Sequence, residues 1–224
     1  MACWSPENAT KAYIRTLKME RQEKEPNAAE FISALAAGNN AQVMVAACAQ
    51  KMATPNLLAL VSAAQQTGGH VTCIFPTREE LQSSKHALKS DAKFVNFVVG
   101  DAKDMLLNEY KDADFFLVDC NFKDYEGVMK GLHATKRVKN GVILGYNAFC
   151  KGSSWQWSGL RTHLLPIGEG LLVTRIGGNN NNVGDFRGEK GVRKSNWIVK
   201  VDKCTGEEHV FRVRSPQRKV AAVL

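Results

Sequence analysis

The sequence lacks the patterns that mark several classes of protein. No hydrophobic run approaches the roughly 20 residues that a membrane-spanning helix needs. The N-terminus does not show the basic and then apolar pattern of a signal peptide. The six cysteines are scattered without a CxxC pair, which argues against a zinc site and against a disulfide framework. We therefore expect a soluble cytoplasmic protein, with the nucleus as an alternative location, and we expect no bound metal.

An excess of basic residues, by contrast, is present. The formal net charge is +8 at pH 7, and much of the excess lies after Arg187. Such a charge permits attraction to nucleic acid or to an anionic surface, although a solvated basic surface is the plainer interpretation. No helix-turn-helix or zinc-finger signature appears, and aromatic residues do not interleave with the basic ones. A nucleic-acid or anionic-surface binder therefore stays one hypothesis, and nucleic acid is not the expected partner.

Short apolar runs alternate with helical patterns through the middle of the chain. The expected strands are 42–48, 71–75, 94–99, 115–118 and 141–145, and the expected helices are 54–66, 77–89, 102–110 and 125–137. This alternation predicts an α/β fold with a parallel sheet and right-handed crossovers. The 224 residues and the 44% hydrophobic content suit a single domain of this kind.

The two ends of the chain show other patterns. Ser5 followed by Pro6 and Glu7 predicts the start of a helix, and 28–37 predicts a second one. Runs at 163–167 and 171–176 predict a hairpin, and those at 197–201 and 209–213 predict another. We expect one domain, with N-terminal helices in 1–40, a core in 41–176, a flexible linker in 177–192, and a C-terminal hairpin and tail in 193–224.

The fourth expected strand ends at a carboxylate. The unbroken apolar run 115–118 suits a strand that is buried on both faces, and Asp119 follows it directly before a helical pattern. Open α/β sheets bind their ligands at the carboxyl ends of such strands. Asp119 is therefore a candidate site residue, although a residue in this place can equally cap or turn the chain.

Four motifs carry a resemblance to a known class of enzymes. They are VVGDAKDML at 98–106, FFLVDCNFKDY at 115–125, NGVILGYN at 140–147 and LLPIGEGLLVTR at 164–175. Their order and spacing resemble the small S-adenosylmethionine-dependent O-methyltransferases of the catechol and caffeoyl-coenzyme A class. The resemblance implies a Rossmann-like, mostly parallel seven-stranded sheet with helices on both faces and one reversed edge strand. The whole chain resembles a plant family, related to that class, that is catalogued as a domain of unknown function.

Some positions keep the pattern of the class. Gly100, Asp101 and Ala102 match the turn on the adenine side of S-adenosylmethionine. Asp119 and Asn147 match the first acid and the amide that hold a divalent ion in the metal-dependent members. The resemblance therefore implies Gly100, Asp101, Ala102 and Asp119 as cofactor-binding residues, with S-adenosylmethionine as the possible cofactor.

Four other positions depart from the pattern of the class, and each has a different role there. The turn at 46–54 has no glycine, and Phe75 stands where the class has the acid that holds the ribose. Tyr146 replaces the second metal-binding acid, and Phe122 replaces a lysine near the methyl acceptor. We therefore expect a possible pseudoenzyme, a degenerate methyltransferase fold that acts as an interaction or regulatory module. An O-methyltransferase with an altered site, in which Trp155 and Trp157 stack on an aromatic ligand, is the alternative. We also expect a protein partner and a possible homodimer.

Overall fold

The computed structural model describes residues 4–19, 27–49, 54–134, 141–151 and 162–176, together with the backbone of Ser195–Val201 and Glu208–Arg214. The chain divides into two compact units, Met1–Asn179 and Asn180–Leu224. The grouping of all 224 residues into one domain stays a prediction. The expected linker at 177–192 lies outside the described residues, as do Trp155 and Trp157.

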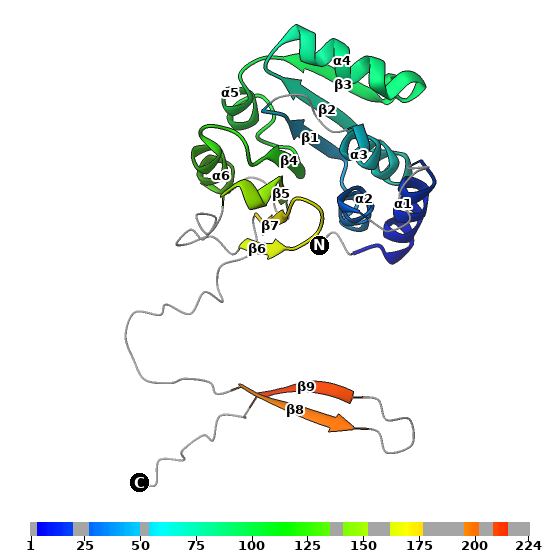
Figure 1. Ribbon diagram of the computed structural model, residues 1–224, viewed down its shortest axis with the longest axis vertical. Coiled ribbons are helices and arrows are strands. Elements are labelled where there is room, and N and C mark those ends of the chain that lie inside the picture. The colour runs from blue at the N-terminus through cyan, green and yellow to red at the C-terminus, as the bar shows by residue number, and fades with distance from the viewer. Residues whose placement is uncertain are drawn as a thin grey trace, which may run out of the picture. The chain divides into compact units, whose positions relative to one another are not determined.

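Strands and helices alternate in the first unit as the sequence predicts (Figure 1). The helices are α1 (Pro6–Met19), α2 (Ala28–Gly38), α3 (Thr54–Thr67), α4 (Arg78–Leu88), α5 (Ala102–Leu107) and α6 (Tyr125–Ala134), with 3-10 turns η1 (Lys89–Phe94) and η2 (Ala148–Lys151). The strands are β1 (Val43–Ala47), β2 (His70–Phe75), β3 (Val95–Val99), β4 (Phe115–Asp119), β5 (Val142–Tyr146), β6 (Thr162–Leu165) and β7 (Leu171–Arg175).

These seven strands form one sheet in the order β3-β2-β1-β4-β5-β7-β6. Neighbouring strands from β3 to β5 are parallel, whereas β7 is antiparallel to β5 and to β6. Helices α1, α2 and α3 lie on one side of the sheet and α5 and α6 on the other (Figure 1). The predicted α/β class, with a mostly parallel seven-stranded sheet, is confirmed.

The position of the reversed strand corrects the prediction. It was expected at the edge of the sheet, but the reversed strand β7 lies between β5 and β6, and β6 forms the edge. Burial gives the physical reason. Leu171, Leu172 and Thr174 of β7 are buried, whereas every residue of β6 is partly or fully exposed. The more apolar strand takes the inner position because it is covered on more sides there.

Local signals in the sequence set most of the helix boundaries. Thr77 caps α4, because its hydroxyl accepts a hydrogen bond from the amide of Glu80 at 3.3 Å. Ser5 accepts from the amide of Asn8 at 3.3 Å at the predicted start of α1. Helix α5 is shorter than predicted: it ends at Leu107 and not near Tyr110, whose amide still donates to the carbonyl of Met105 at 2.8 Å. The chain therefore leaves the helix through a wide final turn.

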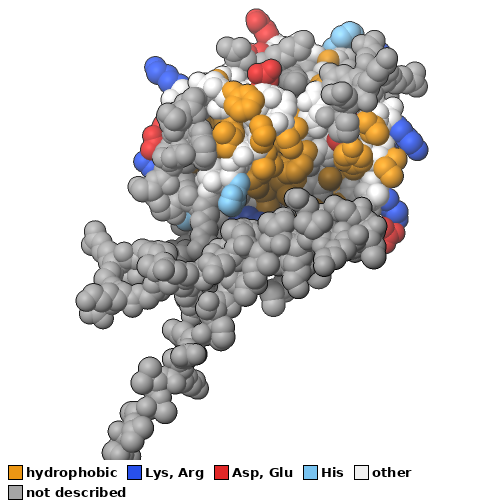
Figure 2. All heavy atoms as spheres, turned by 60° about the horizontal axis from the view of Figure 1, so that its bottom comes forward, with side chains coloured by type: hydrophobic (Ala, Val, Ile, Leu, Met, Phe, Trp, Pro, Cys, Tyr) orange, Lys and Arg blue, Asp and Glu red, His pale blue; other side chains and the backbone are white. Residues whose placement is uncertain are grey.

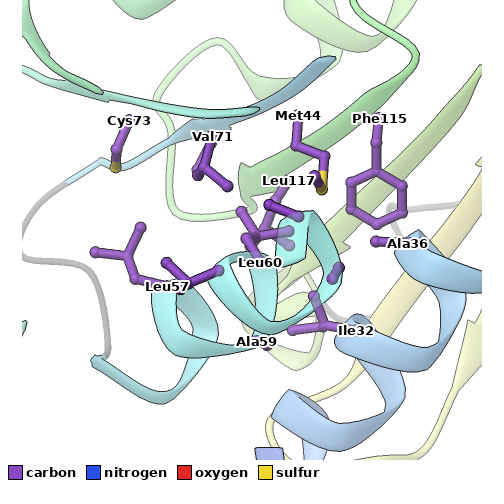
Figure 3. Packing of buried hydrophobic residues seen from close by; sticks show 14 of the residues in the cluster. Ile32, Ala36, Met44, Leu57, Ala59, Leu60, Val71, Cys73, Phe115 and Leu117 are labelled. Atoms are coloured by element: carbon purple, nitrogen blue, oxygen red, sulfur yellow. The ribbon is translucent and has the colours of Figure 1, made fainter. Parts of the chain in front are cut away.

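The core consists of two clusters, one on each face of the sheet. All five residues of β4 are buried, and successive side chains enter opposite clusters. Phe115 and Leu117 join Met44 and Leu60 in the cluster under α2 and α3 (Figure 3). The side chains of Cys48, Cys73 and Cys120 are buried and form no disulfide, and the side chain of Cys150 is exposed.

The second unit contains a two-stranded antiparallel sheet, formed by β8 (Ser195–Val201) and β9 (Glu208–Arg214). Its register pairs Ser195 with Arg214 and Val201 with Glu208. The predicted C-terminal hairpin strands are therefore confirmed, each slightly longer than expected. Across the ranges given above, no helix is both long and apolar enough to pass through a membrane.

Candidate functional site

The carboxyl ends of five parallel strands line up along one edge of the sheet. Register pairs Ala47 with Ile74 and with Val118, Phe75 with Val99, and Asp119 with Tyr146. The candidate site residues follow these strand ends. This is the edge at which open α/β sheets bind ligands, so the fold places the sequence-predicted residues where a cofactor would be bound.

The predicted adenine-side turn follows β3. The amide of Gly100 donates to the carbonyl of Phe75 at 3.0 Å, which continues the pairing of β3 with β2. A side chain on Gly100 would meet the sulfur of Met105 at 2.5 Å, so the backbone approaches that side chain closely. Asp101 is exposed and caps α5, because its Oδ1 accepts from the amide of Asp104 at 2.8 Å. The turn is therefore a formed structure with one carboxylate at the surface.

The structure does not bring this turn next to Asp119. Strands β2 and β1 lie between β3 and β4 in the sheet. Three strand spacings amount to about 14 Å, so the two parts of the predicted site lie at opposite ends of a shared edge. An extended ligand would have to cross the ends of β2 and β1 to contact both. Residues 50–53, which follow β1, lie outside the described residues.

Asp119 is a buried carboxylate that is fully engaged with its neighbours. Its side chain accepts from the amide of Asn121 at 3.0 Å and from the amide of Ala49 at 3.4 Å. It also accepts from the Nδ2 of Asn147 at 3.0 Å. Only 4% of the residue is exposed. Such a carboxylate is held in place by protein donors and contributes to joining the ends of β1, β4 and β5.

Asn147 adopts an unusual backbone conformation to reach this carboxylate. Its φ is 59°, in the left-handed region that asparagine tolerates better than most residues. Because a carboxylate can only accept, the amide nitrogen of Asn147 faces Asp119 and its oxygen faces away. The acid and the amide that match metal ligands of the class are therefore joined to each other directly.

Tyr146 fills the position of the second metal-binding acid. The side chain is 4% exposed, and among the described residues its hydroxyl has no hydrogen bond of good geometry. Burial raises the pKa of the Tyr146 phenol well above its ordinary value, and the nearby Cys48 and Asp119 add to the rise. A neutral phenol is a poor ligand for magnesium, which prefers carboxylates and water.

Two thiols lie close to this phenol. The Sγ atoms of Cys48 and Cys73 are 3.5 Å apart, and both side chains are completely buried. Burial raises the pKa of the Cys73 thiol, and the contact with Cys48 raises it further. The Cys73 thiol is therefore a protonated packing group, because a nucleophilic or metal-binding cysteine needs a thiolate.

The residues at the other two altered positions are packed side chains. Phe75, at the position of the ribose-binding acid, is fully buried, and its ring stacks on that of Phe97 with centroids 6.1 Å apart. Phe122, at the position of the lysine, is half-buried against the cluster on the α5 and α6 face, and Lys123 is exposed. Tyr125 is 2% exposed, so its side chain packs in the core.

A small hollow lies beside Tyr146 and Asn147. It has a volume of about 200 Å³ over the described residues. It is lined by the first residues of α2 and α3 and by the turn between β6 and β7. Ligand pockets usually have volumes of about 300–1,000 Å³, so this hollow is small for a cofactor. Within the described ranges, no group of three or more His, Cys, Asp or Glu side chains is arranged to hold a metal ion.

Burial of Tyr146 predicts a dependence of stability on alkaline pH. The folded-state pKa is raised above the ordinary value of 10.0, so the contribution of the buried phenol is intact below about pH 10 and is lost as pH rises further. We expect Tyr146→Phe to remove this loss. Above about pH 10, the free energy of unfolding of the wild-type chain should then fall with pH more steeply than that of the variant, by about 1.4 kcal/mol per pH unit. Urea unfolding of both proteins between about pH 8 and pH 11 measures it. Parallel pH profiles would contradict the prediction.

Comparison with solved structures identifies the fold. The chain is similar to a putative caffeoyl-CoA O-methyltransferase from Staphylococcus aureus, with a TM-score of 0.54 and 15% identity, over 77% of this chain and 93% of that chain. It is similar to an SAH-bound methyltransferase from Podospora anserina, with a TM-score of 0.53 and 15% identity, over 78% and 90% of the two chains. A methyltransferase from Geobacter sulfurreducens has a TM-score of 0.51 and 17% identity, over 75% and 89%.

These similarities establish a methyltransferase-like fold, and at such identities they establish the fold alone. No match was found among curated proteins. One family does match by sequence, over residues 1–213, and its description is "Protein of unknown function (DUF1442)". Because the match covers almost the whole chain, the protein belongs to this family.

Proposed function

We propose that this protein uses a methyltransferase fold as an interaction or regulatory module and transfers no methyl group. The direct hydrogen bond between Asn147 and Asp119, at 3.0 Å, is the observation that carries the proposal. In the class that the sequence resembles, the matching acid and amide hold a divalent ion together. Here the amide of Asn147 donates its hydrogen bond to the carboxylate of Asp119. The buried phenol of Tyr146 occupies the place of the second acid.

The cost of reopening this arrangement supports the proposal. A metal ion would have to break the Asn147–Asp119 hydrogen bond and turn the amide so that its oxygen faced the ion. A hydrogen bond to a charged group contributes about 1.5–3 kcal/mol. Tyr146 would then offer a neutral oxygen in place of a carboxylate. The residues present therefore do not fit a magnesium ion.

The ribose side of the cofactor site supports the proposal independently. Phe75 is fully buried and stacks on Phe97, so its side chain belongs to the core and offers no acceptor. The hydroxyls of a ribose placed at the end of β2 would lose the carboxylate that the class supplies. That loss is about one to two decades in affinity, from a contact of about 1.5–3 kcal/mol.

A second candidate is a protein that binds S-adenosylmethionine with altered contacts. Two features favour it. Gly100, Asp101 and Ala102 form the turn between β3 and α5, as the resemblance to the class implies. Asp119 ends β4, again as the class has it. In this case the exposed Asp101 would hold the adenine side, and Asp119 would orient the backbone after β1 through Ala49. The two candidates differ in whether the cofactor binds at all.

A thermal-shift titration of the full chain separates them. We expect S-adenosylmethionine and S-adenosylhomocysteine, each at about 1 mM, to leave the melting temperature unchanged within about 1 °C. A ligand at 100 times its dissociation constant would stabilise the protein by about 2.7 kcal/mol, or roughly 5–10 °C for a chain of this size. A methyltransferase of known cofactor affinity is the positive control, and ATP controls for the binding of adenine alone. A shift of several degrees with both ligands but not with ATP would reject the proposal in favour of the second candidate.

A further inference from the structure

Helix α1 turns one face to the protein and another to solvent. Its buried residues are Ala9, Ala12 and Thr16, and the helix packs against α2 and α3 (Figure 1). A spacing of three or four residues places four other side chains on one outward face of the helix: Lys11, Ile14, Arg15 and Lys18. This face therefore carries three cations around one apolar side chain.

An open hollow lies along this face. It has a volume of about 350 Å³ and is lined by these four side chains and by Gln66, near the end of α3. Most of its wall is carbon, because lysine and arginine lay their aliphatic stems along apolar surface while their charged ends reach water. Ile14 is 43% exposed, and Leu17, three residues further along, is 37% exposed. The hollow therefore combines an apolar interior with a basic rim.

Two of the cations on the rim have no opposite charge beside them. Lys11 pairs with Glu7 at 2.5 Å, but Arg15 and Lys18 form no ion pair with any described residue. The Nε of Arg15 is also buried without a hydrogen-bond partner in the described part of the chain, as is the Oε1 of Gln65 in α3. A guanidinium that is partly withdrawn from water gains more from a carboxylate than a fully solvated one does. This side of the hollow therefore favours an anionic partner.

Apolar surface alone does not identify a partner. Hydrophobic side chains also gather on the face shown in Figure 2, where the charged side chains of the described residues lie mostly at the margin. Such an area does not indicate the charge of what covers it, whereas the hollow on α1 does. The unpaired Arg15 and Lys18 select an acidic partner, and Ile14 selects an apolar side chain within that partner.

We propose that this hollow binds an acidic amphipathic helix of a partner protein. The inference rests on the proposed interaction role and names the kind of partner. A helix laid along α1 would place an apolar side chain beside Ile14 and carboxylates next to Arg15 and Lys18. Because Lys18 lies about 6 Å along the helix from Ile14, the partner needs acidic residues one turn from its apolar ones. Arginine adds specificity, since its guanidinium can bind one carboxylate through two hydrogen bonds.

The shape of the surface favours a helix over a membrane. A helix that lies in a membrane surface inserts one whole apolar face, but α1 buries its inward face against α2 and α3. The hollow lies between α1 and the end of α3. Grooves between helices are surfaces to which amphipathic helices bind in other complexes.

Binding of a synthetic peptide to the full chain tests the proposal. The probe is a fluorescent, alanine-based peptide of about 20 residues, long enough to form a helix by itself, with glutamates one heptad apart and leucines midway between them. We expect fluorescence anisotropy to give a dissociation constant below about 200 μM at low salt. A peptide with glutamine for glutamate, and one with alanine for leucine, should each bind at least about fivefold more weakly. No binding of the first peptide, or equal binding of all three, would overturn the proposal.

Lys18→Glu and Lys85→Glu form a matched pair of variants. Each reverses an exposed lysine in the last turn of a helix, α1 and α4 respectively, so the effects on the helix dipole are similar. We expect Lys18→Glu to weaken peptide binding by roughly fivefold and Lys85→Glu to change it by less than about twofold. Arg15→Gln, which keeps part of the aliphatic stem, should weaken binding by a factor similar to that of Lys18→Glu. Circular dichroism checks that each variant is folded. Equal effects of the two lysine reversals would mean that net charge alone attracts the peptide, and the proposal would fail.

Two other occupants are outcomes of the same experiment. If the chain sediments with phosphatidylcholine vesicles that contain about 30% phosphatidylserine, and Lys18→Glu abolishes this, the hollow faces a membrane and the proposal is overturned. Residues 20–26 follow α1, lie outside the described residues and contain Glu20, Glu23 and Glu25. If the peptide binds only after these three are changed to glutamine, this segment of the chain is the occupant and no partner helix is needed.

The thermal-shift titration with S-adenosylmethionine keeps this inference apart from the proposed function. A chain that binds the peptide through Lys18 and is also stabilised by the cofactor keeps the hollow as a docking site and rejects the proposed function. A chain that responds to neither the peptide nor the cofactor rejects the hollow and leaves the proposed function standing.

Discussion

Phe115→Ala is expected to lower the free energy of unfolding by about 3–5 kcal/mol. Phe115 is fully buried in the central strand β4, and its ring lies near Ala36 of α2 (Figure 3). Removing the ring leaves a cavity between the sheet and this helix, because a close-packed interior closes only partly around a deletion. A loss of this size is a large fraction of the 5–15 kcal/mol that holds a typical domain together.

Urea unfolding followed by circular dichroism measures this loss, with an unchanged slope as evidence that the two-state transition is kept. Phe149→Ala is the matched control, because it makes the same chemical change at a residue that is 49% exposed. The control should cost less than about 1 kcal/mol. Similar losses at the two positions would mean that the packing of Phe115 against the α2 and α3 layer has been misjudged.

Gly145→Ala is expected to lower the free energy of unfolding by about 2–3 kcal/mol, although it adds only a methyl group. Gly145 lies in β5, and a Cβ atom there would overlap the hydroxyl of Tyr125 and meet the Sγ of Cys120 at 2.9 Å. Both of these side chains are buried, so neither can move into solvent. The cost arises because one of them, or the strand itself, has to shift.

Tyr125→Phe supplies the control for this prediction. It deletes the oxygen that the new methyl group would overlap, so the double variant should be at least 1 kcal/mol more stable than the sum of the two single changes implies. Unfolding free energies of the four chains give this coupling directly. If the two substitutions are simply additive, the overlap with Tyr125 is not the source of the cost.

Much of the fold could be predicted because the signals that set it are local. The apolar run 115–118 is bounded by Asp114 and Asp119, and it became the fully buried strand β4. Thr77 and Ser5 marked helix starts through side-chain hydrogen bonds to amides only three residues away. Interactions of this range are visible in a sequence, since both partners lie in one short segment.

The parts that were missed depend on residues far apart in the chain. The reversed strand was expected at the edge because the resemblance implied it, and nothing within 171–175 shows that β6 lies outside it. The hydrogen bond between Asn147 and Asp119 joins residues 28 positions apart. The departures at Phe75 and Tyr146 were visible as residue types, but the burial of these two side chains depends on helices and strands from elsewhere. No local signal could have predicted the Cys48–Cys73 contact.

The inner position of β7 has a consequence for how the chain is made. This strand is synthesised after every other strand of its sheet, yet it has a neighbour on each side, β5 and β6. A nascent chain that has emerged only as far as β6 therefore exposes the unpaired edge of β5, whose side chains are all buried in the finished protein. The edge of β5 is covered only after residues up to Arg175 have emerged from the ribosome. Until then, the exposed edge is a surface to which chaperones can bind.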